Sequence, residues 1–286
     1  MAVELSVAVI IPAFNAASVI GEQLRALSLQ THQNFRVVVS DNGSTDGTRK
    51  AVEAWMPQFK SLIWVLADGR KGAAHARNTG IRSVTSDLVL ICDSDDAVGP
   101  DWVAAHVEVL GRYQASTGPL YIVDAVGQER REIWNADSIP RTMNYLQYMP
   151  SCNAGFRRAA FDAVGGFDEE LWRGHEDVDL GWRLCLAGFT IGHAPDAVIQ
   201  YVQRSGASKR LKQQFQYGQA FAQLFAKHKS RPIPVQSRRW RARWWSEWLL
   251  KNLGIPQRWK SAPATIAFQI GRIYRSRLLN VHSPMW

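Results

Sequence analysis

Four short runs of hydrophobic residues are spaced along the first hundred residues of the chain. They cover residues 7–11, 35–40, 62–66 and 88–92. A short run that is apolar on both faces is typical of a strand buried inside a parallel sheet. Between the runs, hydrophobic residues recur at helical spacing over residues 19–29, 47–55 and 73–84. This alternation of strand and helix predicts an α/β fold with a mainly parallel central sheet flanked by helices.

The pattern is less regular after residue 101. It predicts a strand at residues 121–123, a loop at residues 138–149, and helices at residues 159–164, 177–187 and 211–228. We therefore divide the chain into a front domain, residues 1–205, and a helical extension, residues 206–286.

Three carboxylates follow the last of the four hydrophobic runs, at Asp93, Asp95 and Asp96. The carboxyl ends of parallel strands meet at one edge of a sheet, where open α/β folds bind their ligands. Like charges this close together repel one another unless a cation lies among them. Asp93 and Asp95 therefore suggest a site for Mg²⁺ or Mn²⁺ that bridges the protein to phosphate oxygens. The alternative is a solvated acidic turn without a ligand.

Polar residues also follow the other three predicted strands, so we expect them at the same edge. Residues 12–15 follow the first strand, Asp41 the second and Asp68 the third, where they can contact a base and a ribose. No G-x-G-x-x-G follows the first strand, which counts against a dinucleotide cofactor, and no G-x-x-x-x-G-K-[ST] occurs. Phosphate would then be bound by the metal with Lys71 and Arg77, unless Arg77 is only a charge on a helix surface.

A second acidic cluster, Glu176-Asp177-Val178-Asp179, opens a predicted helix. Carboxylates at a helix N-terminus are favoured by the helix dipole, which is a sufficient structural reason for their presence. The functional interpretation is a general base, which needs one ionised carboxylate within hydrogen-bond reach of a hydroxyl.

Six motifs of the chain occur in the order and spacing of one known family. They are Val9-Ile10-Ile11-Pro12-Ala13-Phe14-Asn15, Ser40-Asp41-Asn42-Gly43-Ser44-Thr45-Asp46-Gly47-Thr48, Lys71-Gly72-Ala73-Ala74-His75-Ala76-Arg77-Asn78, Asp93-Ser94-Asp95-Asp96, Gly165-Gly166-Phe167-Asp168 and Glu176-Asp177-Val178-Asp179-Leu180. Over residues 6–202 they resemble the family 2 glycosyltransferases, inverting enzymes with the GT-A fold. The resemblance implies that the front domain is a GT-A catalytic domain, with a nucleotide-binding half at residues 1–100 and an acceptor-binding half at residues 101–205.

The resemblance also implies transfer of a sugar, with inversion, from a nucleotide diphosphate donor to an acceptor hydroxyl, with Mn²⁺ or Mg²⁺ as cofactor. Together with the strand-end argument, it assigns to the nucleotide sugar Pro12, Ala13, Phe14, Asn15, Asp41, Asp68, Lys71, Arg77, Asp93 and Ser94. Asp95 and Asp93 would hold the metal. Asp177 would be the catalytic base, with Glu176 as the alternative.

The acceptor side is expected, from position alone, at Asn153 and Trp172. Uridine diphosphate sugars are the commonest donors in the family. The expected acceptor is a glycan or a lipid-linked molecule, as in polysaccharide biosynthesis.

One departure from the family's pattern concerns the metal. Members often place a histidine shortly after the last sheet segment as a third ligand, but residues 198–203 contain none. His193 comes slightly earlier and is expected to pack or to hydrogen bond. We therefore expect fewer protein ligands and a low affinity for the metal in the absence of donor.

The extension differs in charge from the rest of the chain. From residue 203 onward, 17 of the chain's 34 lysines and arginines stand against a single acid, Glu247. Six of the 12 tryptophans lie at or beyond Trp240, interleaved with arginines. Ile266, Ile270, Ile273, Tyr274, Leu278 and Val281 share one helical face, with Arg272 and Arg275 opposite. Such helices suit the interface of an anionic membrane. Packing on the catalytic domain and a homodimer interface are the main alternatives, and nucleic-acid binding is the weakest.

The expected location is the cytoplasm, on the inner face of the cell membrane. The three cysteines show no C-x-x-C spacing, no signal peptide opens the chain, and no hydrophobic run approaches the roughly 18 residues of a spanning helix.

Two rival functions are a sugar nucleotidyltransferase and a non-catalytic nucleotide-sugar-binding protein. The first usually has a basic, Gly-rich loop after strand one, which residues 12–17 lack, and the second does not explain two acidic clusters.

Overall fold

The computed structural model describes residues 5–123, 130–202, 207–235 and 262–283. The chain divides into two compact units. The first, which we call the sheet unit, comprises Met1–Pro140, Leu146–Trp172 and Glu176–Gln203. The second, the helical unit, comprises Arg204–Trp286 with the short pieces Arg141–Tyr145 and Arg173–His175. The tryptophan-rich stretch from Trp240 to Trp259, with Glu247, lies outside the described residues.

The central sheet has seven strands in the order β10-β6-β9-β4-β1-β2-β3. These strands are β1 (Val7–Ala13), β2 (Arg36–Asp41), β3 (Leu62–Leu66), β4 (Leu88–Cys92), β6 (Ala115–Thr117), β9 (Asn153–Arg157) and β10 (Ile191–His193). The pairs β1–β2, β1–β4, β2–β3 and β10–β6 are parallel, while β9 is antiparallel to both of its neighbours. The predicted mainly parallel sheet is confirmed, and its first four strands end along one edge.

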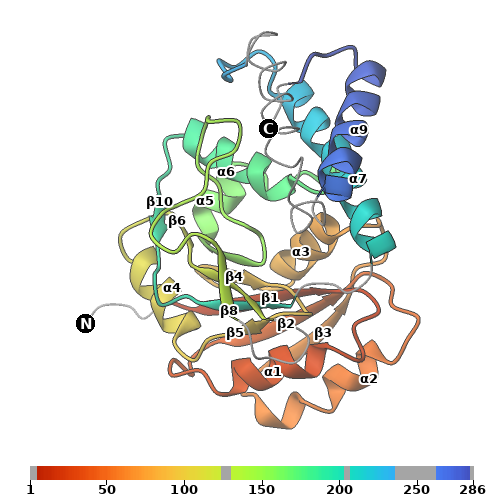
Figure 1. Ribbon diagram of the computed structural model, residues 1–286. Coiled ribbons are helices and arrows are strands. Elements are labelled where there is room, and N and C mark those ends of the chain that lie inside the picture. The colour runs from red at the N-terminus through yellow and green to blue at the C-terminus, as the bar shows by residue number, and fades with distance from the viewer. Residues whose placement is uncertain (1–4, 124–129, 203–206, 236–261, 284–286) are drawn as a thin grey trace. The chain divides into compact units, whose positions relative to one another are not determined.

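Helices cover both faces of this sheet (Figure 1). One face packs against α1 (Ile20–Ser28), α2 (Thr48–Glu53) and α4 (Trp102–Leu110), and the other against α3 (Ala73–Arg82), α5 (Arg158–Ala163) and α6 (Glu176–Leu186). Along β1, Val9 and Ile11 belong to the first core, while Ala8 and Ile10 belong to the second. The unbroken apolar run of β1 follows from this burial on both faces.

A second, smaller sheet lies within the same unit, with strands in the order β5-β11-β7-β8. It consists of β5 (Ala97–Val98), β11 (Ile199–Val202), β7 (Leu120–Val123) and β8 (Arg130–Trp134). β11 pairs antiparallel with β5, the short strand that begins directly after the acidic turn of residues 93–96. The end of the sheet unit is therefore brought back to that turn.

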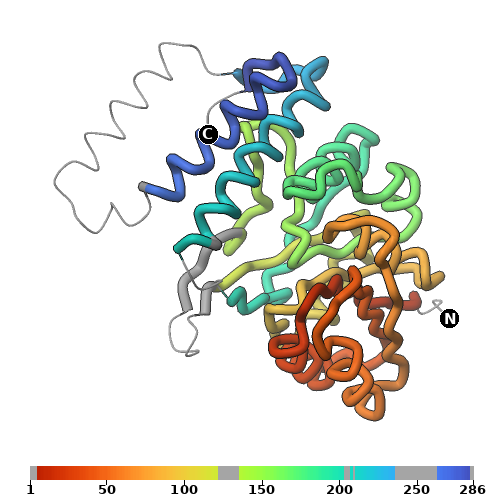
Figure 2. Tube along the Cα trace, turned by 90° about the vertical axis from the view of Figure 1, so that its right-hand side faces the viewer, coloured from red at the N-terminus to blue at the C-terminus, as the bar shows by residue number. Residues whose placement is uncertain are grey.

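The helical unit contains α7 (Ala207–Lys227) and α9 (Ala262–Leu278), which lie side by side (Figure 2). Two glycines allow their backbones to approach closely. A Cβ at Gly218 would collide with the carbonyl oxygen of Phe268, and one at Gly271 with that of Phe215. The predicted helical extension is thus present. Among the described residues, the helices lack the combination of length and hydrophobicity that crossing a membrane demands.

Candidate active site

The loops after β1 and β2 are joined by hydrogen bonds at the carboxyl edge of the sheet. The backbone N–H of Asn15 donates to Ser44 Oγ (2.8 Å), and the N–H of Thr45 donates to Asn15 Oδ1 (2.9 Å). Asn15 has a positive φ of 50°, a conformation that asparagine tolerates better than most residues. Phe14 next to it is 62% exposed, so its ring is available to a ligand.

Asp41, at the end of β2, is buried and both of its carboxylate oxygens are engaged. Oδ1 accepts from the backbone N–H of Ser44 (2.9 Å) and Oδ2 accepts from Trp64 Nε1 (3.1 Å). The predicted site residue Asp41 therefore also shapes the loop that follows it.

The loop between β3 and α3 is held by Asn42. Its Nδ2 donates to the carbonyls of Ala67 (2.5 Å) and Arg70 (2.7 Å), and its Oδ1 accepts from the N–H of Gly72 (2.8 Å). Asp68 and Lys71, two of the predicted donor-binding residues, are exposed on this loop. Asn42 belongs to the second of the six sequence motifs, but the motif alone does not predict this role in holding the loop.

Arg77, on α3, is the most constrained residue of the site. Its side chain is 3% exposed; Nη2 donates to Asp93 Oδ1 (2.8 Å) and Nη1 donates to Glu176 Oε1 (2.7 Å). Burial disfavours its charge, but the carboxylates of Asp93 and Glu176 more than offset this and raise the pKa of Arg77. The alternative of a surface helix charge is wrong, and direct contact with phosphate would compete with two ion pairs.

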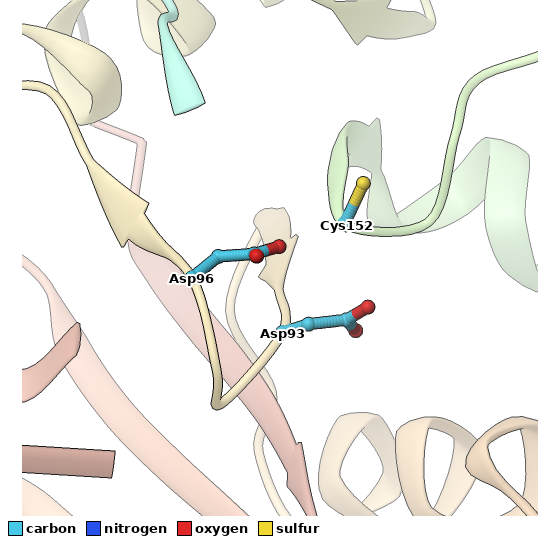
Figure 3. Close-up of side chains that lie close together, drawn as sticks. All are labelled: Asp93, Asp96 and Cys152. Carbon is cyan, nitrogen blue, oxygen red and sulfur yellow. The ribbon is translucent and has the colours of Figure 1, made fainter. Parts of the chain in front are cut away.

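Asp93, Asp96 and Cys152 converge beside the end of β4 (Figure 3). Each of the three side chains offers one ligand atom, and these atoms lie within 4.8 Å of one another. Among the described residues, this is the group of acid, histidine and cysteine side chains that are close enough together to hold a metal ion. Asp95 lies in the same turn, half-buried, but outside this group. Mg²⁺ and Mn²⁺ prefer carboxylate oxygens, so the two aspartates of this group fit such an ion, whereas the Cys152 thiol does not.

The segment expected to carry a metal-binding histidine does reach this turn. The backbone N–H of Val202, in β11, donates to Asp96 Oδ1 (3.2 Å). In this chain the segment thus contributes a backbone N–H to Asp96, and it has no histidine that could bind a metal. His193 donates from Nε2 to the carbonyl oxygen of Asn135 (2.7 Å), in keeping with its expected hydrogen-bonding role.

Glu176 and Asp177 open α6, and they differ in their partners. Glu176 is paired with Arg77, whereas Asp177 accepts from the backbone N–H groups of Val178 (2.8 Å) and Ser151 (3.3 Å). Burial, and then the negative charge of Glu176, raise the pKa of Asp177 from 3.8 to about 7. A carboxylate with this pKa can hold a proton or release it near neutral pH.

The structure contradicts the expectation that Asn153 contacts the acceptor. The side chain is fully buried; Oδ1 accepts from Trp102 Nε1 (2.8 Å) and His106 Nε2 (3.0 Å). Nδ2 donates to the carbonyls of Pro119 (3.1 Å) and Ala197 (2.7 Å). Because all four bonds of its amide go to the protein, Asn153 joins the two sheets and leaves nothing for a sugar.

Trp172 remains accessible, with 45% of its surface exposed. A Cβ at Gly72, which has a φ of 124°, would lie 3.0 Å from Trp172 Cβ, so the backbone and Cβ of Trp172 pack against the β3–α3 loop. This position next to the donor-side loop is consistent with a role toward a sugar.

A second link from α3, missed in the sequence, runs parallel to that of Arg77. Glu169 accepts from Asn78 Nδ2 (2.9 Å) and lies 2.8 Å from His75 Nδ1. Asn78 also bonds both the carbonyl and the N–H of Phe167. Asn78 and Phe167 belong to two of the six sequence motifs, but only the fold shows that these two motifs contact each other.

Two family models match the chain. "Glycosyl transferase family 2" matches residues 8–165, more than half of the chain, and "Glycosyl transferase family group 2" matches residues 88–270. The "Pre-mycofactocin glycosyltransferase" of Mycobacterium tuberculosis is 28% identical over 243 residues, covering 80% of this chain and 49% of that protein. The succinoglycan biosynthesis protein ExoA of Rhizobium meliloti is 29% identical over 244 residues, with 78% and 71% covered. The chain thus spans about half the length of the mycobacterial relative.

Solved structures agree in fold. The mannosyltransferase PcManGT from Pyrobaculum calidifontis, in complex with GDP-Man and Mn²⁺, has a TM-score of 0.63 at 22% identity, covering 98% of this chain and 79% of that one. S. aureus TarS in complex with UDP-GlcNAc has a TM-score of 0.58 at 19% identity, covering 96% and 84%. At such identities the likeness shows the fold alone. With the family model over residues 8–165, it establishes that this chain belongs to glycosyl transferase family 2 and has the GT-A fold.

Proposed function

We propose that this protein is an inverting glycosyltransferase that moves a sugar from a nucleotide diphosphate to an acceptor hydroxyl, assisted by a divalent cation. The observation that carries the proposal is the buried guanidinium of Arg77, bonded to Asp93 after β4 and to Glu176 at the start of α6. It joins two acidic clusters that lie far apart in the sequence into one site. A protein that only binds a nucleotide sugar has no need of the second cluster.

Asp177 is assigned the role of base. Its raised pKa gives the carboxylate enough proton affinity to accept a hydroxyl proton, while Glu176 is engaged by Arg77. In one displacement the acceptor oxygen bonds to the anomeric carbon, the bond from that carbon to the phosphate oxygen breaks, and the diphosphate leaves with the electron pair. The proton goes to Asp177. A single in-line displacement inverts the anomeric configuration.

The donor is assigned to the loops at the carboxyl edge of the sheet. Phe14 offers an exposed ring for a nucleobase, and Asp68 and Lys71 are exposed at the adjacent loop. We favour a uridine diphosphate sugar, because TarS binds UDP-GlcNAc; PcManGT, which binds GDP-Man, makes the guanosine donor the alternative.

A cation is assigned to the turn after β4. Asp93 and Asp96 would hold it, with Asp95 and Ser94 in the same turn within reach of the donor. When bound, Mn²⁺ or Mg²⁺ would neutralise the charge that develops on the leaving diphosphate. The protein's own contribution there is Arg77, which keeps Asp93 in place and compensates part of the negative charge.

The acceptor is assigned to the side of Trp172 and Asp177. Its class, a glycan or a lipid-linked sugar chain, rests on the relatives named for succinoglycan and amylovoran biosynthesis. A cytoplasmic enzyme at the inner membrane face suits such an acceptor.

The test is release of nucleoside diphosphate from a panel of nucleotide sugars with Mn²⁺, comparing wild type with Asp93→Asn and Asp177→Asn. We expect wild type to release diphosphate from at least one donor and both variants to lose at least a hundredfold in rate. The anomeric configuration of the product, read by NMR, should be opposite to that of the donor.

Asp162→Asn is the matched control, since Asp162 is an exposed acid on α5 whose ion pair with Arg158 is outside the site. It should retain wild-type activity. Equal rates for wild type, Asp93→Asn and Asp177→Asn, or retention of configuration, would overturn the proposal.

A further inference from the structure

The helix α9 has its polar side turned inward and its apolar side turned outward. The buried positions include Gln269, Arg272 and Ser276, all less than 9% exposed. The opposite side carries large hydrophobic residues that are 41–59% exposed, namely Ile266, Ile270, Ile273, Tyr274 and Leu278. We call these five residues the α9 apolar face. A helix that packs on a water-soluble domain normally shows the reverse arrangement.

The orientation of α9 is fixed by hydrogen bonds on its buried side. Arg272 donates from Nε to Gln269 Oε1 (2.7 Å) and from Nη1 to the carbonyl oxygen of Ser283 (2.9 Å). The hydroxyls of Ser276 and Ser283 lie 2.7 Å apart. On the same side, Gly271 makes the close approach to Phe215 in α7. Rotating the helix to bury its isoleucines would break these bonds and collide with α7, so the apolar face is held outward.

The part of the sequence that contains this face is strongly basic. Residues 204–286 contain 17 lysines and arginines and one acid. Arg277 is exposed among the apolar residues themselves. Arg173, which belongs to the same unit, has its pKa lowered by burial and by the positive charge of Arg275. Cations that are close enough to repel one another favour a partner that supplies negative charge.

The charge decides which partner fits. A second copy of this chain would oppose the same positive charge, which disfavours self-association through this face. Single-stranded nucleic acid would match the charge, but it stacks on aromatic rings, and four of the five residues are aliphatic. An anionic bilayer offers both an apolar layer for the isoleucines and phosphate groups for the arginines.

We propose that the α9 apolar face binds the interface of an anionic membrane, with Ile266, Ile270, Ile273, Tyr274 and Leu278 inserted among the lipids and the neighbouring arginines at the headgroups. This attaches the protein to one leaflet without a spanning helix. The proposal concerns the helical unit alone, so it stands or fails independently of the sugar transfer proposed for the sheet unit.

The experiment is vesicle flotation of the full-length protein at about 0.05 M salt, with vesicles of phosphatidylcholine containing about 30 mol% phosphatidylglycerol. We expect wild type to float with these vesicles and to stay behind with pure phosphatidylcholine. The double variant Ile270→Glu/Leu278→Glu should reduce the bound fraction at least tenfold. Both positions are more than half exposed, so the fold is retained, which circular dichroism checks.

Leu29→Glu is the matched control, because Leu29 is 61% exposed at the end of α1 in the sheet unit. It should float like wild type. In wild type, amide hydrogen exchange over residues 262–278 should slow when anionic vesicles are added.

Three results would overturn the proposal. They are wild type that fails to float with anionic vesicles, a folded double variant that floats as well as wild type, and a wild-type dimer that the double variant converts to monomer while flotation is absent. The last outcome would assign the face to a second copy of the chain.

Discussion

The central sheet of the sheet unit and the helix α9 of the helical unit bury opposite kinds of side chain. In the sheet unit the strands β1 and β4 contribute apolar residues to the cores on both faces of the sheet, and Arg77 holds Asp93 and Glu176 near the carboxyl edge. In the helical unit, Arg272 and Ser276 are buried between helices, and isoleucines face outward.

This difference indicates which side chains already have their partners within the chain and which are exposed to an outside partner. In the sheet unit the buried charge of Arg77 is already matched by the carboxylates of Asp93 and Glu176, so these side chains are held in place before a ligand arrives. The large apolar residues on the outward side of α9 are 41–59% exposed, and the proposed membrane contact would cover them. Substitutions in the first unit should therefore act together, and those in the second should act additively.

The largest effect is expected for Asp177→Asn, which removes the assigned base. We expect kcat to fall about 1,000-fold, in the range typical of lost general-base catalysis. Flotation with anionic vesicles should not change. Both expectations are checked by measuring diphosphate release and flotation on the same protein sample. If a folded variant lost both activity and vesicle binding, the two units would not function independently.

The next largest effect is expected for Arg77→Lys, which tests whether the ion pairs of Arg77 with Asp93 and Glu176 organise the site. A lysine keeps the positive charge but cannot donate to Asp93 and Glu176 from one planar group, so one buried carboxylate loses its partner. We expect the free energy of unfolding to fall by about 2–3 kcal/mol, measured by denaturant titration. The exposed Arg49→Lys serves as control and should be neutral within about 0.5 kcal/mol. A neutral Arg77→Lys would mean that the two ion pairs do not organise the site.

A smaller effect, with an informative sign, is expected for Gly271→Ala in the helical unit. Helix propensity alone would make alanine about 1 kcal/mol more stable. The new Cβ would collide with the Phe215 carbonyl, so we expect destabilisation of about 1–3 kcal/mol instead. Hydrogen exchange should accelerate in α7 and α9. Gly21→Ala in α1 is the matched control, because its Cβ would lie 3.7 Å from the nearest atom, and it should stabilise the protein.

The smallest effect is the pH dependence of stability set by Asp177. Its pKa is raised from 3.8 to about 7 on folding, so the folded state disfavours the ionised carboxylate. This group therefore contributes a penalty that is absent below about pH 4 and grows as the pH rises towards 7. Asp177→Asn removes this penalty, so at pH 8 the variant should have a higher free energy of unfolding than wild type. At pH 4 the two proteins should melt at the same temperature.

The same pKa predicts that kcat/KM of wild type falls about tenfold per pH unit below pH 7, as the base becomes protonated. A rate that stays flat down to pH 5 would argue against Asp177 as the base.

Much of the sheet could be predicted from the sequence, since an apolar run between turn residues specifies a buried strand. Residues 62–66 and 88–92 are strands with the predicted ends. The convergence of Asp41 and Asp93 at one edge followed from parallel pairing alone. Residues 141–145 and 173–175, which belong to the helical unit, carry no such periodic signal.

The partners of individual side chains could not be predicted. Asn153 follows a proline-containing segment that reads as a loop, and only the fold brings Trp102 and His106 to its amide. For α9 the periodicity identified the apolar face correctly. It did not show that Arg272, on the other side, would be the buried one, because a helical pattern does not say which side packs.

Cys152 gives the acidic turn a chemical vulnerability. Burial, and then the charges of Asp96 and Asp93, raise the pKa of its thiol well above the usual value, so the sulfur is protonated and slow to oxidise. A thiophilic ion that displaces this proton would gain a sulfur ligand that Mg²⁺ cannot use. At the cation site proposed for this turn, the sulfur atom would therefore favour Zn²⁺ or Cd²⁺ over Mg²⁺.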